Sequence, residues 1–364
     1  MIPQKYKRSI LSVGPDWRNP QGGVAQVIAN YASDIFGRDG FHAVINSGNG
    51  HESMLRKVWF GVAGLGALVG KLLTKPSIKV VHIHTSSYKS FERSALFMRV
   101  SKALGRKVIL HMHGGAMRDY HAKRPEYVTS KLQSADAVIT LSATWKKFYD
   151  TLADPERVHV VNNIISAPSE AVGKTASAQT AANQHTGTLK LLFLGHLYDA
   201  KGIFDLVEVI AENADRWRGR LHLDIGGSGG VERLKQLIAD RGVSDMVEFR
   251  GWVSGEKKAE LLSGCDWFIL PSYTEGLPLT MLEAMSYGKP VLLTPVGAIP
   301  EVADDRVGRL FTPGDHQDMA RAIDSALSLS ADEYTALSDA ARQRAVPFTP
   351  AEVQKQLIEV YDSL

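Results

Sequence analysis

Short apolar runs alternate with amphipathic segments along most of this chain, and polar turns rich in glycine and proline separate them. Between the runs, apolar residues recur at helical spacing, for example over 24–35, 97–104, 203–212 and 231–240. Strands that alternate with helices predict α/β domains built on doubly wound parallel sheets. The predicted strands are Ser9–Val13, Lys79–His84, Lys107–Gly115, Ala135–Ser142, Val158–Val161, Leu189–Gly195, Leu221–Ile225, Met246–Phe249, Asp266–Leu270 and Val291–Thr294.

One segment divides this pattern into two series. Residues 166–187 are rich in Ala, Ser, Thr and Gln and have no apolar period, which is typical of a linker or mobile loop. We therefore expect a Rossmann-like domain over 1–168, a linker over 169–188 and a second Rossmann-like domain over 189–348, with a cleft between the two sheets. A final helix is expected over 349–364.

The stretch from Ser272 to Val291 carries two glutamates around the start of a predicted helix. Pro278 suits the first helical residue, so Glu275 lies in the preceding loop and Glu283 lies about 7–8 Å along the axis. A helix start attracts phosphate, whereas a carboxylate repels it. The pair therefore suits neutral hydroxyls, a sugar at Glu275 and a ribose at Glu283. The alternative is that both glutamates only favour the helix dipole.

Two other elements have the geometry of phosphate sites. Gly22 and Gly23 lie between a predicted strand and a helix, although the spacing is not Gly-x-Gly-x-x-Gly and so does not support dinucleotide binding. The alternative there is a tight turn. Lys201 also follows a strand and opens a helix, where it either neutralises phosphate oxygens or is an ordinary surface lysine.

Several polar side chains are expected at the carboxyl ends of the first-domain strands, where ligands bind in such sheets. These are His84, His113 and Ser142. His111 and His113 point the same way along one strand, but no third ligand is nearby, so no metal site is expected. His82 and His111 are expected to be structural.

The segment around Glu275 and Glu283 resembles the signature of family 4 of the retaining glycosyltransferases. The resemblance rests on Glu275-x7-Glu283 with Pro271-Ser272 before it, Gly288-x-Pro290-Val291 after it and Pro300-Glu301-Val302 at its end. Similarity extends over nearly the whole chain. It implies a GT-B fold, in which two Rossmann-like domains face each other across a cleft and the last helix packs back on the first domain. The first domain is expected to bind the acceptor, and the second is expected to bind the nucleotide sugar.

The resemblance also implies roles for individual residues. His113, Glu275 and Lys201 are expected to be catalytic, with His113 facing the donor sugar. The family commonly has an arginine at the position of His196, and a neutral imidazole offers one donor and no bidentate fork. The expected donor-binding residues are Gly22, Gly23, His196, Gly251, Trp252, Val253, Gly276, Leu277, Pro278, Leu279, Thr280 and Glu283.

The expected activity is transfer of a hexose from a nucleoside diphosphate sugar to a hydroxyl with retention of configuration. The sequence has no Asp-x-Asp, so neither a metal nor a cofactor is expected. Glu-Gly-Leu-Pro stands where many relatives have Glu-Gly-Phe-Gly, and this variant favours UDP-sugars over GDP-mannose. The alternatives are a nucleotide-sugar epimerase of the same two-domain plan and a non-catalytic sugar-nucleotide-binding protein.

Charge is distributed unevenly along the chain. Residues 1–160 carry 23 Lys and Arg against 11 Asp and Glu, whereas the remainder carries 19 against 28. A basic half suits nucleic acid, an anionic membrane or a phosphorylated substrate, and no interleaving of aromatic and basic residues supports nucleic acid. We expect a lipid-linked glycan acceptor at the inner membrane face, in exopolysaccharide, capsule or lipopolysaccharide assembly, and a cytoplasmic or peripheral membrane protein.

The longest apolar run is Val58–Gly70, whose 13 residues fall short of the roughly 18–20 that a membrane span needs. It is expected to form a helix that either packs against a sheet or lies in a bilayer interface. The single cysteine, Cys265, excludes an internal disulfide and fits a reducing compartment.

Overall fold

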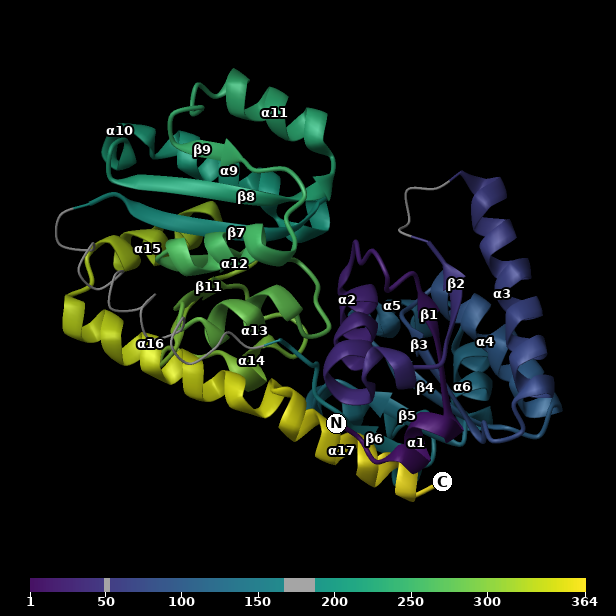
Figure 1. Ribbon diagram of the computed structural model, residues 1–364. Helices are drawn as coiled ribbons and strands as arrows, with labels where there is room; N and C mark the ends of the chain where they lie inside the picture. The colour runs from purple at the N-terminus through teal and green to yellow at the C-terminus, as the bar shows by residue number, and fades with distance from the viewer. Residues whose placement is uncertain (49–52, 167–186) are drawn as a thin grey trace. The chain divides into compact units, whose positions relative to one another are not determined.

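The computed structural model describes residues 1–48, 53–166 and 187–364, which form two α/β units (Figure 1). Unit 1 comprises Met1–Ser166 and Pro347–Leu364, and unit 2 comprises Ala167–Val346. Of the predicted linker, residues 169–186 lie outside the described residues.

Unit 1 is built on a parallel sheet of six strands in the order β2-β1-β3-β4-β5-β6. Every residue of β3 and β5 is buried, as expected for a parallel sheet covered on both faces. The strands are β1 Ile10–Pro15, β2 Ala43–Ser47, β3 Val80–Thr85, β4 Lys107–Met112, β5 Ala137–Thr140 and β6 Val158–Val160.

The helices of unit 1 flank this sheet (Figure 1). The first long one, α2, continues into a π-helical segment over Tyr31–Phe36. The helices are α1 Gln4–Ser9, α2 Gly23–Asn30, α3 Met54–Thr74, α4 Lys89–Ala103, α5 Met117–Lys123, α6 Pro125–Ser134, α7 Ala143–Tyr149 and α17 Pro350–Asp362.

Unit 2 is built on a second parallel sheet of six strands, in the order β12-β11-β10-β7-β8-β9. The order of the strands reverses between β7 and β10, which is the point where open α/β sheets bind ligands beyond the carboxyl ends of their strands. The strands are β7 Leu189–Leu197, β8 Leu221–Gly229, β9 Val247–Phe249, β10 Trp267–Leu270, β11 Val291–Leu293 and β12 Gly308–Leu310.

Helices also flank the sheet of unit 2 (Figure 1). Two of them, α9 and α11, have the bounds that the apolar spacing predicts. The helices are α9 Ile203–Glu212, α10 Ala214–Trp217, α11 Val231–Asp240, α12 Gly255–Gly264, α13 Leu279–Ser286, α14 Ile299–Val302, α15 His316–Leu327 and α16 Ala331–Ala345.

The two predicted series of parallel strands are confirmed, and the structure adds an edge strand to each sheet. These strands, β2 and β12, were not predicted from the sequence. β2 alternates buried and half-buried residues and has no continuous apolar run, and β12 has only three residues. Both therefore lack the pattern by which buried strands are recognised.

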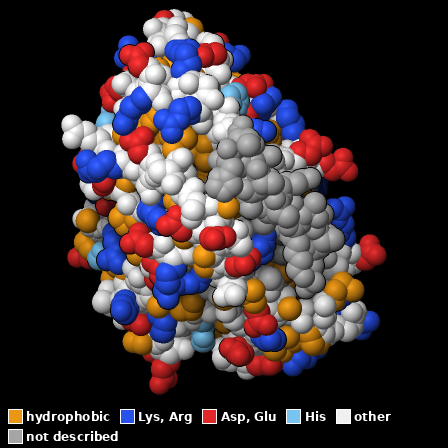
Figure 2. Space-filling view, turned by 90° about the vertical axis from the view of Figure 1, so that its left-hand side faces the viewer, with side chains coloured by type: hydrophobic (Ala, Val, Ile, Leu, Met, Phe, Trp, Pro, Cys, Tyr) orange, Lys and Arg blue, Asp and Glu red, His pale blue; other side chains and the backbone are white. Residues whose placement is uncertain are grey.

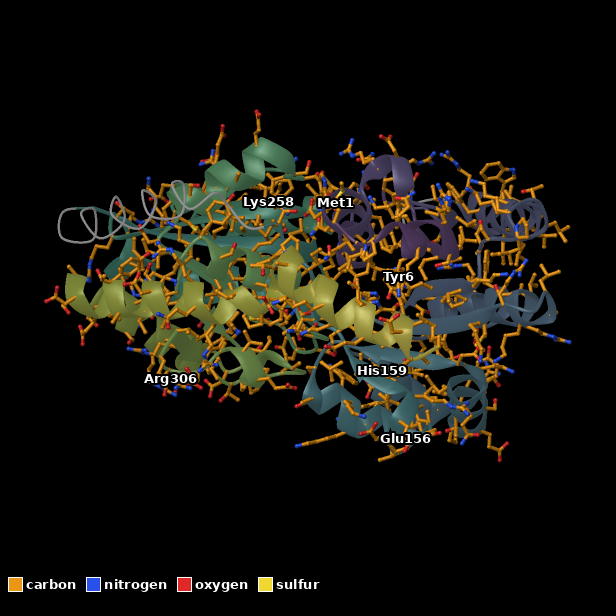
Figure 3. The ribbon with its side chains drawn as sticks, turned by 60° about the horizontal axis from the view of Figure 1, so that its bottom comes forward. Met1, Tyr6, Glu156, His159, Lys258 and Arg306 are labelled. Carbon is orange, nitrogen blue, oxygen red and sulfur yellow. The ribbon has the colours of Figure 1, made fainter. Side chains whose placement is uncertain are left out.

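The last helix, α17, packs on unit 1. The Tyr361 hydroxyl lies 2.9 Å from Nδ1 of His82 in β3. The Tyr6 hydroxyl, labelled in Figure 3, donates a hydrogen bond of 2.5 Å to Asp362. Just before the helix, Phe348 accepts a backbone hydrogen bond of 3.0 Å from Ile165. Unit 1 is therefore assembled from two separate parts of the chain.

Candidate active site

Lys201 and Glu275 meet at the point of unit 2 where the strand order reverses. Lys201 follows β7 and Glu275 follows the neighbouring β10. The lysine Nζ lies 2.5 Å from Oε1 of Glu275, and the Ser272 hydroxyl donates to the same oxygen at 2.7 Å. Glu275 is 8% exposed, whereas the Lys201 side chain is 26% exposed. The carboxylate of Glu275 is thus buried with two hydrogen-bond donors on one oxygen, whereas the Lys201 side chain is partly exposed to solvent.

A glycine allows these two loops to touch. Gly202 has a φ of +65°, and a Cβ at this position would lie 2.1 Å from the carbonyl oxygen of Pro271. The turn before it, Asp199–Lys201, also accepts a backbone hydrogen bond of 2.9 Å from Tyr273 through the Ala200 carbonyl. Only glycine combines the left-handed conformation with this close approach, so Gly202 positions Lys201 over the loop of Glu275.

Glu283 lies in α13 and forms a second buried ion pair. Nζ of Lys258, in α12, lies 2.6 Å from its Oε1. Its other oxygen, Oε2, is buried and has no hydrogen-bond partner among the described residues. Such an orphaned acceptor is rare in native proteins and fits a ligand hydroxyl. Lys258 was not predicted as a site residue, because nothing in the spacing of the chain connects it to Glu283.

Helix α13 begins one residue later than predicted. Pro278 is its N-cap, with an extended ψ of 124°, and Leu279 is the first helical residue. Glu283 therefore lies about 6 Å along the axis from the helix start rather than 7–8 Å. Gly276 and Leu277 are buried in the preceding loop, and Thr280 is half-buried in the first turn. Glu275 and Glu283 still lie on either side of the helix start.

The other predicted donor-binding residues of unit 2 lie near the carboxyl ends of β7, β8 and β9. Nδ1 of His196 lies 3.4 Å from the Ser228 hydroxyl, and its ring stacks 6.5 Å from that of Trp252, which is 40% exposed. Gly251, at φ +75°, accepts a backbone hydrogen bond from Gly227, and Val253 is buried. The structure thus brings His196 and Trp252 together as an aromatic surface.

In unit 1, the predicted residues lie at or beyond the carboxyl ends of the strands. Gly22 is the N-cap of α2, and Gly23 is its first residue. His113 directly follows β4, and its Nε2 lies 3.0 Å from Nδ1 of His84 at the end of β3. Burial lowers the pKa of His113 to about 3, so its imidazole is neutral at physiological pH.

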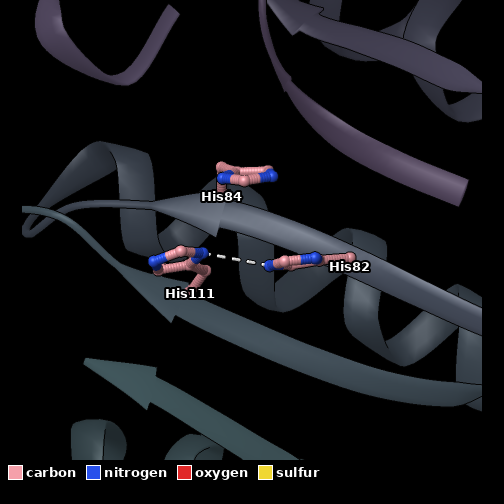
Figure 4. A group of neighbouring side chains, drawn as sticks. All are labelled: His82, His84 and His111. Carbon is pink, nitrogen blue, oxygen red and sulfur yellow. Dashed lines mark hydrogen bonds between the residues drawn. The ribbon is translucent and has the colours of Figure 1, made fainter. Parts of the chain in front are cut away.

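His82, His84 and His111 lie side by side on the neighbouring strands β3 and β4 (Figure 4). Ring nitrogens of His82, His84 and His111 all lie within 4.8 Å of one another. The expectation that no third metal ligand is nearby was therefore wrong, because strand pairing places β3 beside β4.

The arrangement of these rings nevertheless favours hydrogen bonding over metal ligation. His82 and His111 are joined by a hydrogen bond of 3.1 Å between ring nitrogens, as the dashed line in Figure 4 marks. The rings of His82 and His84 stack with planes only 16° apart. Imidazole lone pairs lie in the ring plane, so rings stacked in nearly parallel planes do not direct them at one point. Burial lowers the pKa of His82 to about 3 and that of His84 and His111 well below the ordinary 6.5.

Comparison with known proteins shows similarity to glycosyltransferases. Residues 177–344 match the family model described as glycosyl transferases group 1, and residues 43–163 match the glycosyl transferase 4-like domain. The MMP α-(1→4)-mannosyltransferase of Mycolicibacterium hassiacum is 36% identical over 131 residues, which cover 35% of this chain and 32% of that protein. These findings support a GT-B glycosyltransferase family for the chain.

Solved structures support the same fold. Sucrose-phosphate synthase from Thermosynechococcus elongatus superposes with a TM-score of 0.78 at 17% identity, over 98% of this chain and 99% of that one. Anabaena HepE in complex with UDP-glucose has a TM-score of 0.74 at 18% identity, over 98% and 100%. Together with the two parallel sheets, these matches show the predicted GT-B fold. The matches to curated relatives span from 32% to 58% of those proteins' lengths.

Proposed function

We propose that this protein is a retaining, metal-independent glycosyltransferase that moves a sugar from a nucleoside diphosphate sugar to a hydroxyl acceptor. The observation that carries the proposal is the pair of buried glutamates around the start of α13. Each has one oxygen held by a lysine, and Oε2 of Glu283 has no protein partner among the described residues. A ribose hydroxyl would satisfy that oxygen.

The remaining hydrogen-bonding capacity fits the other parts of such a donor. A lysine ammonium has three N–H donors, and Glu275 occupies one of those of Lys201. The others are available for diphosphate oxygens, as are the N–H groups at the start of α13. The second carboxylate oxygen of Glu275 would accept from sugar hydroxyls, and the ring of Trp252 gives a surface for the base.

The chemistry follows from the leaving group. The bond between the anomeric carbon and the diphosphate oxygen breaks, and the acceptor oxygen bonds to the same face of the carbon. The diphosphate leaves as an anion, so it needs stabilisation of charge more than a proton, and Lys201 supplies this. A diphosphate oxygen takes the proton of the acceptor hydroxyl. His113, neutral because it is buried, would hydrogen bond to the sugar without adding a charge.

A UDP-sugar is the proposed donor, and a lipid-linked glycan of surface polysaccharide assembly is the proposed acceptor. The Glu-Gly-Leu-Pro variant supports the donor, and HepE, which shares the fold, was solved with UDP-glucose. The basic first half of the chain supports an acceptor that carries phosphate at an anionic surface. The identity of the donor and the identity of the acceptor can be tested separately.

The central test is calorimetric binding of UDP to the wild type and to Glu283→Gln. The amide keeps the size of the side chain but replaces an acceptor by a donor in one orientation and loses the charge, so we expect UDP affinity to fall roughly tenfold, about 1.4 kcal/mol. Glu256→Gln, on the exposed start of α12, is the matched control and should bind as the wild type does. Unchanged affinity in Glu283→Gln would remove the ribose assignment.

Activity is tested by incubation with labelled nucleotide sugars and a membrane lipid extract. Transfer of label into lipid supports the proposal, and the anomeric configuration of the product, measured by NMR, tests retention. Consumption of the donor without an acceptor would instead indicate an epimerase. UDP binding without any turnover would indicate a sugar-nucleotide-binding protein.

A further inference from the structure

Helix α3 is longer than the apolar run that predicted it, and it is apolar on both sides. Its inner side packs against β2 and α4 through Gly64, Leu68 and Leu72, which are buried. A Cβ on Gly64 would lie 2.6 Å from the Ile45 carbonyl oxygen, so the helix lies directly against the edge strand. This contact fixes which side of α3 faces the protein.

The opposite side of α3 is exposed and is also apolar. Leu55, Trp59, Val62 and Leu73 are 83%, 64%, 66% and 67% exposed, and Val58 beside them is 58% exposed. The positions between them along this side are small, namely Ala63, Gly66 and Gly70, all exposed. At about 1.5 Å per residue, the stripe from Leu55 to Leu73 is roughly 27 Å long.

A surface helix of a soluble protein normally shows polar residues on its outer side, and one that is apolar all round is usually buried or in lipid. The face drawn in Figure 2, by comparison, shows basic and acidic side chains interspersed. The hydroxyl of Thr74, in the last turn of α3, already donates to the Gly70 carbonyl at 2.7 Å. Little polar desolvation therefore opposes burial of this side.

The charges around the stripe favour an anionic bilayer over a second copy of the helix as the partner that covers it. Helix α3 contains no Asp or Glu, exposed Arg56 lies at its start, and exposed Lys75 follows its end. In a two-fold antiparallel pair of two such helices, the basic ends would face each other. An anionic bilayer complements them instead, because the lysine and arginine reach the headgroups while Trp59 lies at the interface.

Among the described residues, no helix is long and apolar enough to cross a membrane. We propose that the outer side of α3 is a membrane-docking surface, which lies in the interface of an anionic bilayer. This inference extends the proposed function, since it would hold unit 1 at the surface where a lipid-linked glycan is anchored. Docking itself needs neither donor nor turnover.

The test measures binding of the full chain to vesicles of phosphatidylcholine with and without 30% phosphatidylglycerol, by co-sedimentation at low and high salt. We expect binding to the anionic vesicles, weaker binding without phosphatidylglycerol and a decrease with salt. The double variant Trp59→Ser, Val62→Ser should lose at least tenfold in partitioning. Because both positions are exposed, its thermal unfolding should match that of the wild type.

Trp59→Phe is the matched control. It should bind vesicles as the wild type does, but the blue shift of tryptophan fluorescence on binding should shrink, which places residue 59 itself in the interface. Absence of vesicle binding by the wild type, or equal binding by the double variant, would overturn the inference. So would a wild-type dimer in sedimentation that the double variant abolishes, since a second copy would then cover the stripe. Transfer to a water-soluble acceptor, measured in parallel, would remain intact in all these cases if the proposed function holds.

Discussion

Mild acid should destabilise unit 1 through four histidines, which lie in β3, in β4 and directly after β4. Burial keeps the imidazoles of His82, His84, His111 and His113 neutral in the folded protein. It lowers the pKa of His82 and His113 to about 3, and it lowers the pKa of the other two well below the ordinary 6.5. In the unfolded chain each takes up a proton near pH 6.5. The unfolded state therefore binds more protons below that pH, and stability is complete above pH 6.5 and falls as the pH decreases toward the folded pKa.

The size of this effect follows from proton linkage. At pH 5.5 each neutral histidine costs about 1.4 kcal/mol of unfolding free energy relative to high pH, and the four together cost about 5–6 kcal/mol. A typical domain has only about 5–15 kcal/mol of stability, so we expect unit 1 to be close to unfolding at pH 5.5. Urea unfolding followed by circular dichroism at pH 7.5 and 5.5 measures the difference.

Two variants separate the titration from ordinary loss of packing. His82→Gln should reduce the pH-dependent part of the loss by about 1.4 kcal/mol, because one fewer proton is taken up on unfolding. Tyr361→Phe removes the hydroxyl that lies 2.9 Å from His82 but keeps the imidazole, so it should lower stability equally at both pH values. If NMR shows the four imidazoles titrating near pH 6.5 in the folded protein, or if His82→Gln keeps the wild-type pH dependence, the reasoning is wrong.

Three further predictions concern unit 2 and the donor. Gly202→Ala should lose more than about 2 kcal/mol in urea unfolding, because its Cβ would lie 2.1 Å from the Pro271 oxygen, whereas Gly219→Ala, also at positive φ but in open space, should lose only about 1 kcal/mol. Transfer should be insensitive to EDTA; activity abolished by the chelator and restored by a divalent ion would count against a metal-independent mechanism. In a thermal-shift panel UDP-sugars should stabilise more than GDP-sugars, and stabilisation by GDP alone would exclude the UDP assignment.

The strands and most helices of the fold were predictable because a parallel sheet buried on both faces produces continuous apolar runs. The exceptions follow the same physics. Edge strand β2 is only half-buried, so its alternation is weak. Helix α3 extends over 54–74 rather than 58–70, since backbone hydrogen bonds continue through the flanking basic residues. Proline is commonest at the first helical position, whereas Pro278 is the N-cap of α13, so the sequence preference placed the start of this helix one residue too early.

The candidate site was predictable only where its residues are near in sequence. Glu275 and Glu283 share one loop and helix, and their spacing indicated the site. Lys258 is 25 residues from Glu283, and only the packing of α12 reveals the pair. Likewise, His84 lies beside His111 because β3 pairs with β4, and the pattern of a single sequence does not predict which strands pair. Contacts between distant segments therefore account for what the sequence analysis missed.

The return of α17 to unit 1 has a consequence for biosynthesis. The ribosome makes the six strands of the first sheet early, but the helix that contacts α1 through Tyr6 and β3 through His82 is made only after all of unit 2. Until then the nascent first sheet lacks a neighbour on that side. Unit 2 is continuous in sequence, whereas unit 1 needs α17 to be complete, so the part of the protein that is synthesised first should be the last to mature.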